Sequence, residues 1–294
     1  MKYRFIEAQR GHYPVRRLCR ALKVSASGYY AACGRSPSAR SQRQARLISR
    51  IRAIHAASRA TYGAPRVHVE LRVQGEGCSK NTVARLMRGA GIVPKTVRRF
   101  KLTTDSRHTW WTAPNLLGRV FSAPQPNVCW LTDITFIPTR AGWLYLAVML
   151  DLYSRAVVGW AMGDRLDRRL ALNALTMAIA QRGRAPDILH SDRGTLYTVA
   201  EYRALLQRHG IRQSMSRKAD CWDNAPMESF FHTLKTELVM HSDYLTREQA
   251  RCSLFEYMEV FYNRQRRHSS MQYEAPLAFE AMTHPLIKVS TIRG

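Results

Sequence analysis

The amino-acid sequence predicts an α/β protein that begins with an all-α region. Apolar residues recur at helical spacing in the front part, residues 1–125. Beyond it, β-branched and aromatic runs of strand length alternate with helical patterns, which indicates a sheet flanked by helices. Charge follows the same division, because residues 1–125 hold 25 of the 46 Lys and Arg residues but only 4 of the 21 Asp and Glu residues. A chain of 294 residues has room for roughly two domains.

Composition already excludes several classes of protein. A formal net charge of +25 predicts a polyanionic partner. The longest apolar run, residues 143–150, is too short to cross a bilayer, and the N-terminus lacks a signal-peptide core, so we expect a cytoplasmic protein with no membrane association. The six cysteines form no C-x-x-C pair, which argues against a disulfide framework or a zinc ribbon. The sequence has no nucleotide-binding P-loop, which argues against an ATP-driven motor.

The first segment, residues 1–40, is predicted to be helix-turn-helix-like. Pro14 suits the first turn of a helix, and Val15, Leu18 and Leu22 lie on one face of it. Either Ser25 or Ser27 can cap a second short helix.

Residues 41–97 predict a second helix-turn-helix domain of three helices. Leu47, Ile51 and Ile54 form the apolar face of the first helix, Pro65 begins the second, and Ser79 caps the third. The polar face of this third, basic helix fits the major groove of DNA, and its alternative is a helical bundle with a solvated basic face. The residues predicted to contact DNA are Lys80, Asn81, Arg85 and Arg88.

Residues 98–125 predict a proline-containing linker that leads into the rear part. Within it, Trp110 and Trp111 are unusual and are expected to dock on a neighbouring surface or to stack on a base.

The rear part opens with a predicted buried strand, residues 128–137. Trp130, Ile134 and Phe136 share one face by the period of two, and Asp133 lies on the other. A carboxylate in the middle of a strand is costly to bury without a partner. Further strands are predicted at residues 143–150, 156–162, 187–190 and 211–215, and helices at 168–182 and 199–209.

The most informative helix begins near Asp223. Its apolar stripe consists of Met227, Phe231, Leu234 and Leu238. An adjoining polar stripe consists of Asn224, Glu228, His232 and Lys235. Glu228 and Lys235 therefore project side by side from the margin of the buried face, two turns apart.

Three carboxylates occupy chemically informative positions. Asp133 lies on the first strand, Asp192 follows a later strand, where open α/β sheets place their sites, and Glu228 lies on the helix. Three hard oxygen ligands suit Mg²⁺ or Mn²⁺ rather than zinc. Two such ions can activate the attacking oxygen and stabilise the leaving oxygen of a phosphoryl transfer. A zinc site of His and Cys is the weaker alternative, because no histidine pair stands at ligand spacing beside cysteines.

With these residues identified, the sequence resembles the bacterial insertion-sequence transposases of the OrfB type, which carry a D,D,E triad in a retroviral-integrase-like core. The matching runs are residues 130–135 (WLTDIT), 190–194 (HSDRG), 216–231 with Lys235 after them, and 262–268 with Pro276. The resemblance covers essentially the whole chain. It implies a ribonuclease-H-like core, a mixed five-stranded sheet flanked by helices, over residues 126–240, with a helical extension over 241–294.

The resemblance also implies the activity. Asp133, Asp192 and Glu228 would hold Mg²⁺, while Lys235 and Asn224 would contact DNA. The reaction would cut the element ends and join the freed 3′-hydroxyl to another phosphodiester. The partners would be double-stranded DNA, further copies of the chain and an upstream OrfA-type protein, fused by frameshifting or bound.

Two residues depart from the family pattern: Leu196, where Gln is usual, and Ala219, where Gly is usual. Neither removes a metal ligand. The alternatives are a plain ribonuclease-H-type nuclease and a catalytically inactive, transposase-derived DNA-binding regulator. The basic helical front argues against the first, and retention of all three carboxylates and Lys235 against the second.

Overall fold

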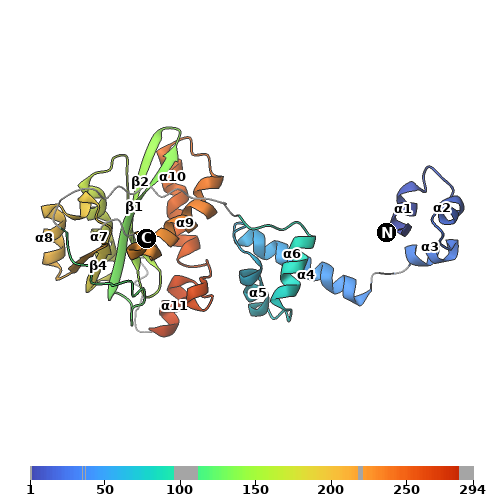
Figure 1. The fold of residues 1–294 in the computed structure, drawn as a ribbon, viewed down its shortest axis with the longest axis horizontal. Coiled ribbons are helices and arrows are strands. Elements are labelled where there is room, and N and C mark those ends of the chain that lie inside the picture. The colour runs from blue at the N-terminus through green and yellow to red at the C-terminus, as the bar shows by residue number, and fades with distance from the viewer. Residues whose placement is uncertain (1, 35, 37, 96–111, 218–220, 285–294) are drawn as a thin grey trace, which may run out of the picture.

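The computed structural model describes residues 2–34, 36, 38–95, 112–217 and 221–284 of the chain. Trp110, Trp111 and Ala219 lie outside the described residues. Within the described part, the chain forms two helical units followed by an α/β core (Figure 1). None of the described helices is both long and apolar enough to cross a lipid bilayer.

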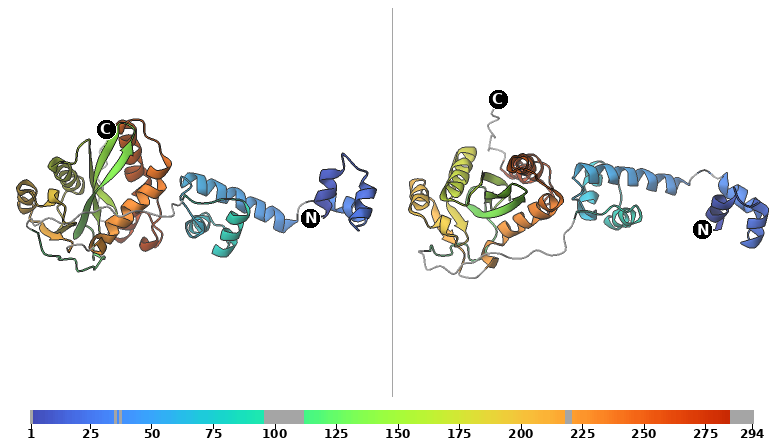
Figure 2. Two further views of the ribbon diagram at one scale, coloured as in Figure 1. Left: turned by 45° about the horizontal axis from the view of Figure 1, so that its top comes forward. Right: turned by 90° about the horizontal axis from the view of Figure 1, so that it is seen from above.

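The front part contains two groups of three helices, which lie in line with the core in all three views (Figure 2). The first group is α1 (Lys2–Gln9), α2 (Val15–Ala21) and α3 (Ala26–Cys33), and the second is α4 (Ala39–Ala57), α5 (Ala64–Val73) and α6 (Lys80–Gly89). The sequence does not predict helix α1, because Ile6 is its one buried residue and gives no periodic signal. Ser25, and not Ser27, caps α3 by accepting a hydrogen bond from Gly28 N at 3.0 Å.

The α4–α6 unit forms around the apolar residues that the sequence assigned to its helices. Ile51, Val67 and Val83, one from each helix, are completely buried together. Ser79 caps α6 as predicted, because its side chain accepts from Thr82 N at 3.2 Å.

The core contains a mixed five-stranded sheet in the order β3-β2-β1-β4-β5. β1 pairs antiparallel with β2, which pairs antiparallel with β3, whereas β4 is parallel to β1 and β5 is parallel to β4. The strands are β1 (Cys129–Thr139), β2 (Gly142–Asp151), β3 (Val157–Gly163), β4 (Ile188–Ser191) and β5 (Arg212–Met215). The five strands predicted from the sequence are therefore confirmed, with ends shifted by at most two residues.

Helices cover both faces of the sheet. On one face, α7 (Arg168–Arg182) and α8 (Ala200–Arg208) enclose a core that contains Trp130. Gly159 on β3 is required here, because a Cβ on it would lie 2.5 Å from the Ala178 Cβ of α7. On the other face, α9 (Ala225–Glu237) and α10 (Arg247–Phe255) pack over Leu131 and other side chains of β1 and β2.

The described chain beyond α9 is mainly helical. A π-helical turn, Glu256–Tyr262, continues α10, and α11 (Pro276–Thr283) follows. Short 3-10 turns cover Thr195–Tyr197, Cys221–Asn224, Val239–His241 and Ser269–Met271. Residues 112–125, in the segment predicted as a linker, contain no helix or strand, and residues 98–111 lie outside the described part.

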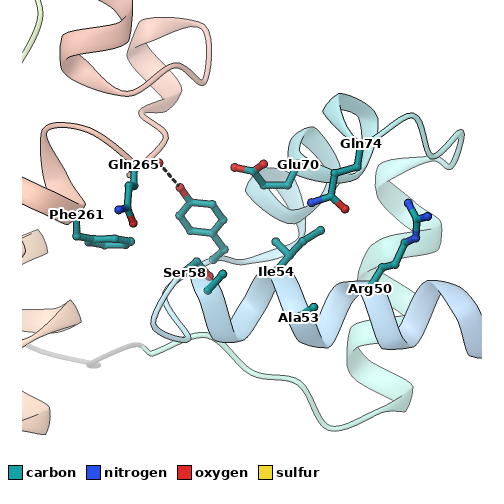
Figure 3. Close-up of a pocket in the computed structure, with 10 residues that line it drawn as sticks. Arg50, Ala53, Ile54, Ser58, Glu70, Gln74, Phe261 and Gln265 are labelled. Carbon is teal, nitrogen blue, oxygen red and sulfur yellow. Dashed lines mark hydrogen bonds between the residues drawn. The ribbon is translucent and has the colours of Figure 1, made fainter.

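The α4–α6 unit contacts the region after the π-helical turn. The Tyr62 hydroxyl donates to Gln265 O at 3.2 Å, shown dashed in Figure 3, and accepts from Arg267 N at 2.7 Å. Arg267 Nε also donates to Glu70 Oε1 at 2.6 Å. A cavity of about 350 Å³ lies beside these contacts, between Ile54 and its neighbours on one side and Phe261 on the other (Figure 3). Contacts between residues far apart in sequence thus place the α4–α6 unit against the core.

Candidate active site

Parallel pairing of β1 and β4 brings two of the predicted carboxylates together. Thr132 on β1 is paired with Ser191 on β4. Asp133 and Asp192 are the next residues of these two strands in the same direction. The carboxylates therefore lie beside each other where β4 ends, which is where parallel strands place functional side chains.

A tight loop holds Asp192. Its Oδ1 accepts a hydrogen bond from Gly194 N at 2.9 Å, and a Cβ on Gly194 would lie only 2.9 Å from the same oxygen. Arg193 Nε donates to Ser216 O at 2.7 Å and ties the loop to the end of β5. The HSDRG run thus folds as a carboxylate-orienting turn, in which a side chain at Gly194 would displace the Asp192 carboxylate.

Helix α9 supplies the third carboxylate. Pro226 stands in its first turn, and Met227 and Leu234 are completely buried against the sheet. Glu228 lies beside this buried stripe at the N-terminal end of the helix, where the helix dipole favours negative charge. The helical spacing predicts this position for Glu228 and a second polar position for Lys235, in the last turn.

One cavity of about 610 Å³ joins these side chains and is named here the carboxylate cavity. Asp133, Asp192 and Glu228 line it, together with His232 and Lys235 of the predicted polar stripe. The remaining lining residues are Ile134, Thr135, Phe136, Leu166, Gly194, Thr195, Leu196, Tyr197, Trp222, Ala225, Ser229 and Phe231. Leu196, one of the two departures from the family pattern, therefore lines the same cavity as the carboxylates.

The environment of the carboxylate cavity disfavours the ionised form of its carboxyl groups. Burial raises the pKa of Asp133 well above its usual range, and the charges of Asp192 and Glu228 raise it further. The hydrogen bond from Ile134 N–H and the charge of Lys235 lower this pKa, but by less. Burial likewise raises the pKa of Glu228. Burial lowers the pKa of Lys235, while the charge of Asp133 acts in the opposite direction. Groups shifted by burial and by charges of like sign within one cavity are typical of functional sites.

The donor set fits a hard divalent cation. Carboxylate oxygens are the ligands that Mg²⁺ and Mn²⁺ prefer, and a cation would offset the repulsion among the three side chains. Within the described ranges, no group of three or more His, Cys, Asp and Glu side chains is arranged closely enough to be recognised as a metal site. The chemistry of the residues, rather than their present spacing, is what matches the ion.

Comparisons with known proteins agree with this arrangement. Two family descriptions named Integrase core domain match residues 123–221 and 209–276, and one named HTH-like domain matches 42–100. The chain is 43% identical over 283 residues to "Transposase InsF for insertion sequence IS3A" of Escherichia coli (strain K12), covering 95% of this chain and 98% of that protein. The chain belongs to the IS3 transposase family. An uncharacterized 31 kDa protein of insertion element IS600 from Shigella sonnei is 42% identical over 270 residues, covering 92% of this chain and 99% of that protein.

Two solved structures are also similar to this IS3-family chain. A chain of the simian T-cell lymphotropic virus intasome, in complex with a PP2A regulatory subunit, is 15% identical with a TM-score of 0.46, over 78% of this chain and 73% of that one. The HTLV-2 integrase catalytic core domain, in complex with magnesium, is 17% identical with a TM-score of 0.42, over 53% and 98%. The ribonuclease-H-like integrase core predicted from the sequence is confirmed by the sheet order and the family descriptions together.

Asn224, predicted from the resemblance to OrfB-type transposases to contact DNA, has a different environment from Glu228. Its side chain is buried, and its Nδ2 donates to Thr132 O on β1 at 3.4 Å. Asn224 does not line the carboxylate cavity. Next to it, Asp223 is completely buried and accepts from Asn115, Arg119 and Arg217. These two residues fix the start of α9 to β1 and to the preceding segments.

The four DNA contacts predicted in the second helix-turn-helix domain of this IS3-family chain lie on one helix, α6. Lys80, Asn81, Arg85 and Arg88 are all exposed on α6, while Val83, Leu86 and Met87 face the core of the unit. The helix therefore presents a polar, basic surface, as the sequence indicated.

Sequence reasoning missed the apolar part of the carboxylate cavity. Phe136 was predicted to lie on the buried face of β1 with Trp130, but it is 43% exposed and lines the cavity. Trp222 and Leu166 line the same cavity and are exposed too. Alternation along β1 correctly assigned Phe136 to the face of Trp130, but it could not show that this position of the face is exposed.

Proposed function

We propose that this IS3-family chain is a DDE-type DNA transposase, which cleaves the ends of its insertion sequence and joins the freed 3′-hydroxyl to another phosphodiester. The observation that carries the proposal is the convergence of Asp133, Asp192 and Glu228, from β1, the end of β4 and α9, on one cavity that also contains Lys235. Three carboxylates and a cation, in a strongly basic chain, suit a phosphodiester substrate.

Asp133, Asp192 and Glu228 would hold Mg²⁺, for which Mn²⁺ can substitute. When bound, the ions would activate the attacking oxygen and stabilise the leaving oxygen. Lys235 supplies a positive charge that attracts the phosphate group at the same cavity.

The rest of the chain would hold and place DNA. We assign residues 1–40 and 41–97 to DNA binding, 98–125 to a linker, 126–240 to catalysis and 241–294 to a helical extension of the core. Base and phosphate contacts are assigned to Lys80, Asn81, Arg85 and Arg88 on α6. Asn224 would act through β1, by keeping α9 in register with Asp133.

The working complex follows from the reaction. Two element ends must be held together, so we propose a homo-multimer on double-stranded DNA. An upstream OrfA-type protein, bound or fused by frameshifting, would add end recognition. The protein would act at the bacterial nucleoid in the cytoplasm.

The direct test is strand cleavage by an Asp192→Asn variant, with Mg²⁺ and a duplex carrying the terminal repeat of the element. Loss of a metal ligand is expected to reduce cleavage by at least about 100-fold, with DNA binding retained. Asp187→Asn, the same substitution at an exposed position just before β4, is the matched control and should cleave normally. Undiminished cleavage by Asp192→Asn would overturn the assignment, and a wild-type protein that binds but never cleaves DNA would identify the regulator instead.

A further inference from the structure

The apolar side of the carboxylate cavity is built from side chains that would normally be buried. Trp222 is 67% exposed, Leu166 is 46% exposed and Phe136 is 43% exposed, and all three line the cavity. Exposed aromatic groups beside a functional cavity are a reliable sign of a binding surface, because water contact with them is unfavourable.

Trp222 is exposed although its backbone is firmly anchored. The next residue, Asp223, is completely buried, and its carboxylate accepts from Arg217 N at 2.8 Å and from Arg119 Nε at 3.0 Å. Asn224, buried as well, bonds to Thr132 O. The anchoring of the two following residues fixes the backbone from which the indole reaches the cavity, so little backbone order has to be gained on binding.

Phe136 is positioned by its neighbours on the sheet. It lies on β1 beyond Asp133, and its ring makes an edge contact with Tyr145 of β2 at a centroid distance of 5.2 Å. The Trp143 ring lies further along the same aromatic row, 6.3 Å from Phe136, but does not line the cavity. Phe136 and Trp222 thus place aromatic surface in the same cavity as the three carboxylates.

We propose that Trp222, assisted by Phe136, stacks on one nucleobase that has left the DNA helix next to the phosphodiester held at the carboxylates. This inference rests on the proposed function and names a feature of the substrate: a locally unpaired step. The cavity, at about 610 Å³, is of the size that binds small molecules, roughly 300–1,000 Å³, and so has room for one nucleotide.

Stacking explains why the aromatic groups stand there. Every base has a π-face, so an aromatic side chain can bind any of them. The free energy of stacking offsets the cost of unpairing a base. Lys235 in the same cavity provides the opposite charge for the adjoining phosphate.

The first experiment measures single-turnover cleavage at saturating DNA by Trp222→Ala, Trp222→Phe and Trp143→Ala proteins. On a fully paired terminal repeat, Trp222→Ala should be about 10-fold slower, a value within the stacking range. Trp222→Phe should cleave within about 3-fold of the wild-type rate, because phenylalanine still stacks. Trp143→Ala removes the same side chain from an exposed position outside the cavity, so it should cleave at the wild-type rate.

The same proteins are then given a duplex in which the step at the cleavage site is already mismatched. Trp222→Ala should now cleave nearly as fast as wild type, because the base no longer has to be taken from its partner. Equal loss on the paired and mismatched duplexes would mean a structural role, and no loss on either would mean that the indole touches no base. Either result would overturn the proposal.

The second experiment does not depend on cleavage. Asp192→Asn protein is bound to a duplex with 5-iodouracil at the positions flanking the cleavage site, irradiated, and the crosslinked peptide is identified. Crosslinking at Trp222 is expected, and crosslinking that stays unchanged in a Trp222→Ala background contradicts the proposal.

The oligomeric state of the DNA-free protein tests another role of the same surface. If sedimentation shows that Trp222→Ala changes the oligomeric state, the surface joins copies of the chain and the proposal is wrong. Absent cleavage in wild type contradicts the proposed function, whereas absent crosslinking with normal cleavage contradicts only this inference.

Discussion

The two ends of helix α9 carry carboxylates in opposite surroundings. Glu228 faces the cavity that Asp133 and Asp192 also line. Glu237, buried at the other end of the helix, accepts from Arg266 Nε at 2.8 Å and from the second guanidinium nitrogen at 2.7 Å. The first set of charges has the same sign, and the second is a matched pair.

The difference separates structural from chemical carboxylates. A buried carboxylate paired with Arg in bidentate geometry is compensated, and removing one partner is expensive. The half-buried carboxylates of the cavity are instead grouped with each other, and their mutual repulsion, which Lys235 offsets in part, lowers the stability of the fold. Such a cost is characteristic of sites that bind a further charged group. Each prediction below tests one side of this comparison.

The largest effect is expected from Asp133→Asn. Strand cleavage should fall by at least about 100-fold because a cation ligand is lost. The free energy of unfolding without metal should rise by about 1 kcal/mol, because a desolvated charge beside Asp192 and Glu228 is removed while the side-chain oxygen can still accept from Ile134 N. Cleavage assays and urea denaturation in chelator measure the two quantities. A variant that is both inactive and less stable would contradict the comparison.

Next in size is Arg266→Met, which leaves Glu237 buried without its main partner. We expect a loss of about 3 kcal/mol in the free energy of unfolding, since breaking a buried ion pair is that costly. The control is Arg140→Ala, which removes an exposed pair with Asp243 and should leave the melting temperature unchanged. Thermal denaturation compares them, and equal effects would show that burial does not distinguish the two pairs.

A smaller effect is expected from Asp223→Asn. Hydrogen bonds from Arg217, and then from Arg119, hold the pKa of Asp223 well below its usual value. The folded state therefore keeps this group ionised where the unfolded state is protonated, and the stability it contributes is complete above about pH 4 and declines as the pH falls further. The variant should be less stable than wild type by about 2 kcal/mol at pH 7.

The pH dependence of that difference is the sharper measurement. Urea denaturation of both proteins at pH 7 and pH 3 should show a smaller difference at pH 3. A difference that is the same at both values would mean that Asp223 acts through packing, and not through its charge.

Local residue patterns predict much of the candidate site. Alternation places Asp133 on the face of β1 opposite Trp130, and helical spacing places Glu228 and Lys235 beside the buried stripe of α9. Burial within one strand or helix leaves a periodic trace in the sequence, so these assignments need no long-range information. The exposed aromatic side chains of the cavity leave no such trace.

The five strands, helices α2 to α9, the charge division and the order of the three carboxylates follow from the sequence alone. The proximity of Asp133 and Asp192 does not, because it is the parallel pairing of β1 and β4 that joins residues far apart in the chain. Tertiary contacts also decide that Tyr62 fastens the basic helical unit to the region after the π-helical turn, and that Trp222 stands exposed on an anchored turn. The physical reason is the same in each case. Strand pairing, the contacts of Tyr62 and the exposure of Trp222 depend on segments that are distant in sequence, which a local pattern of residues does not record.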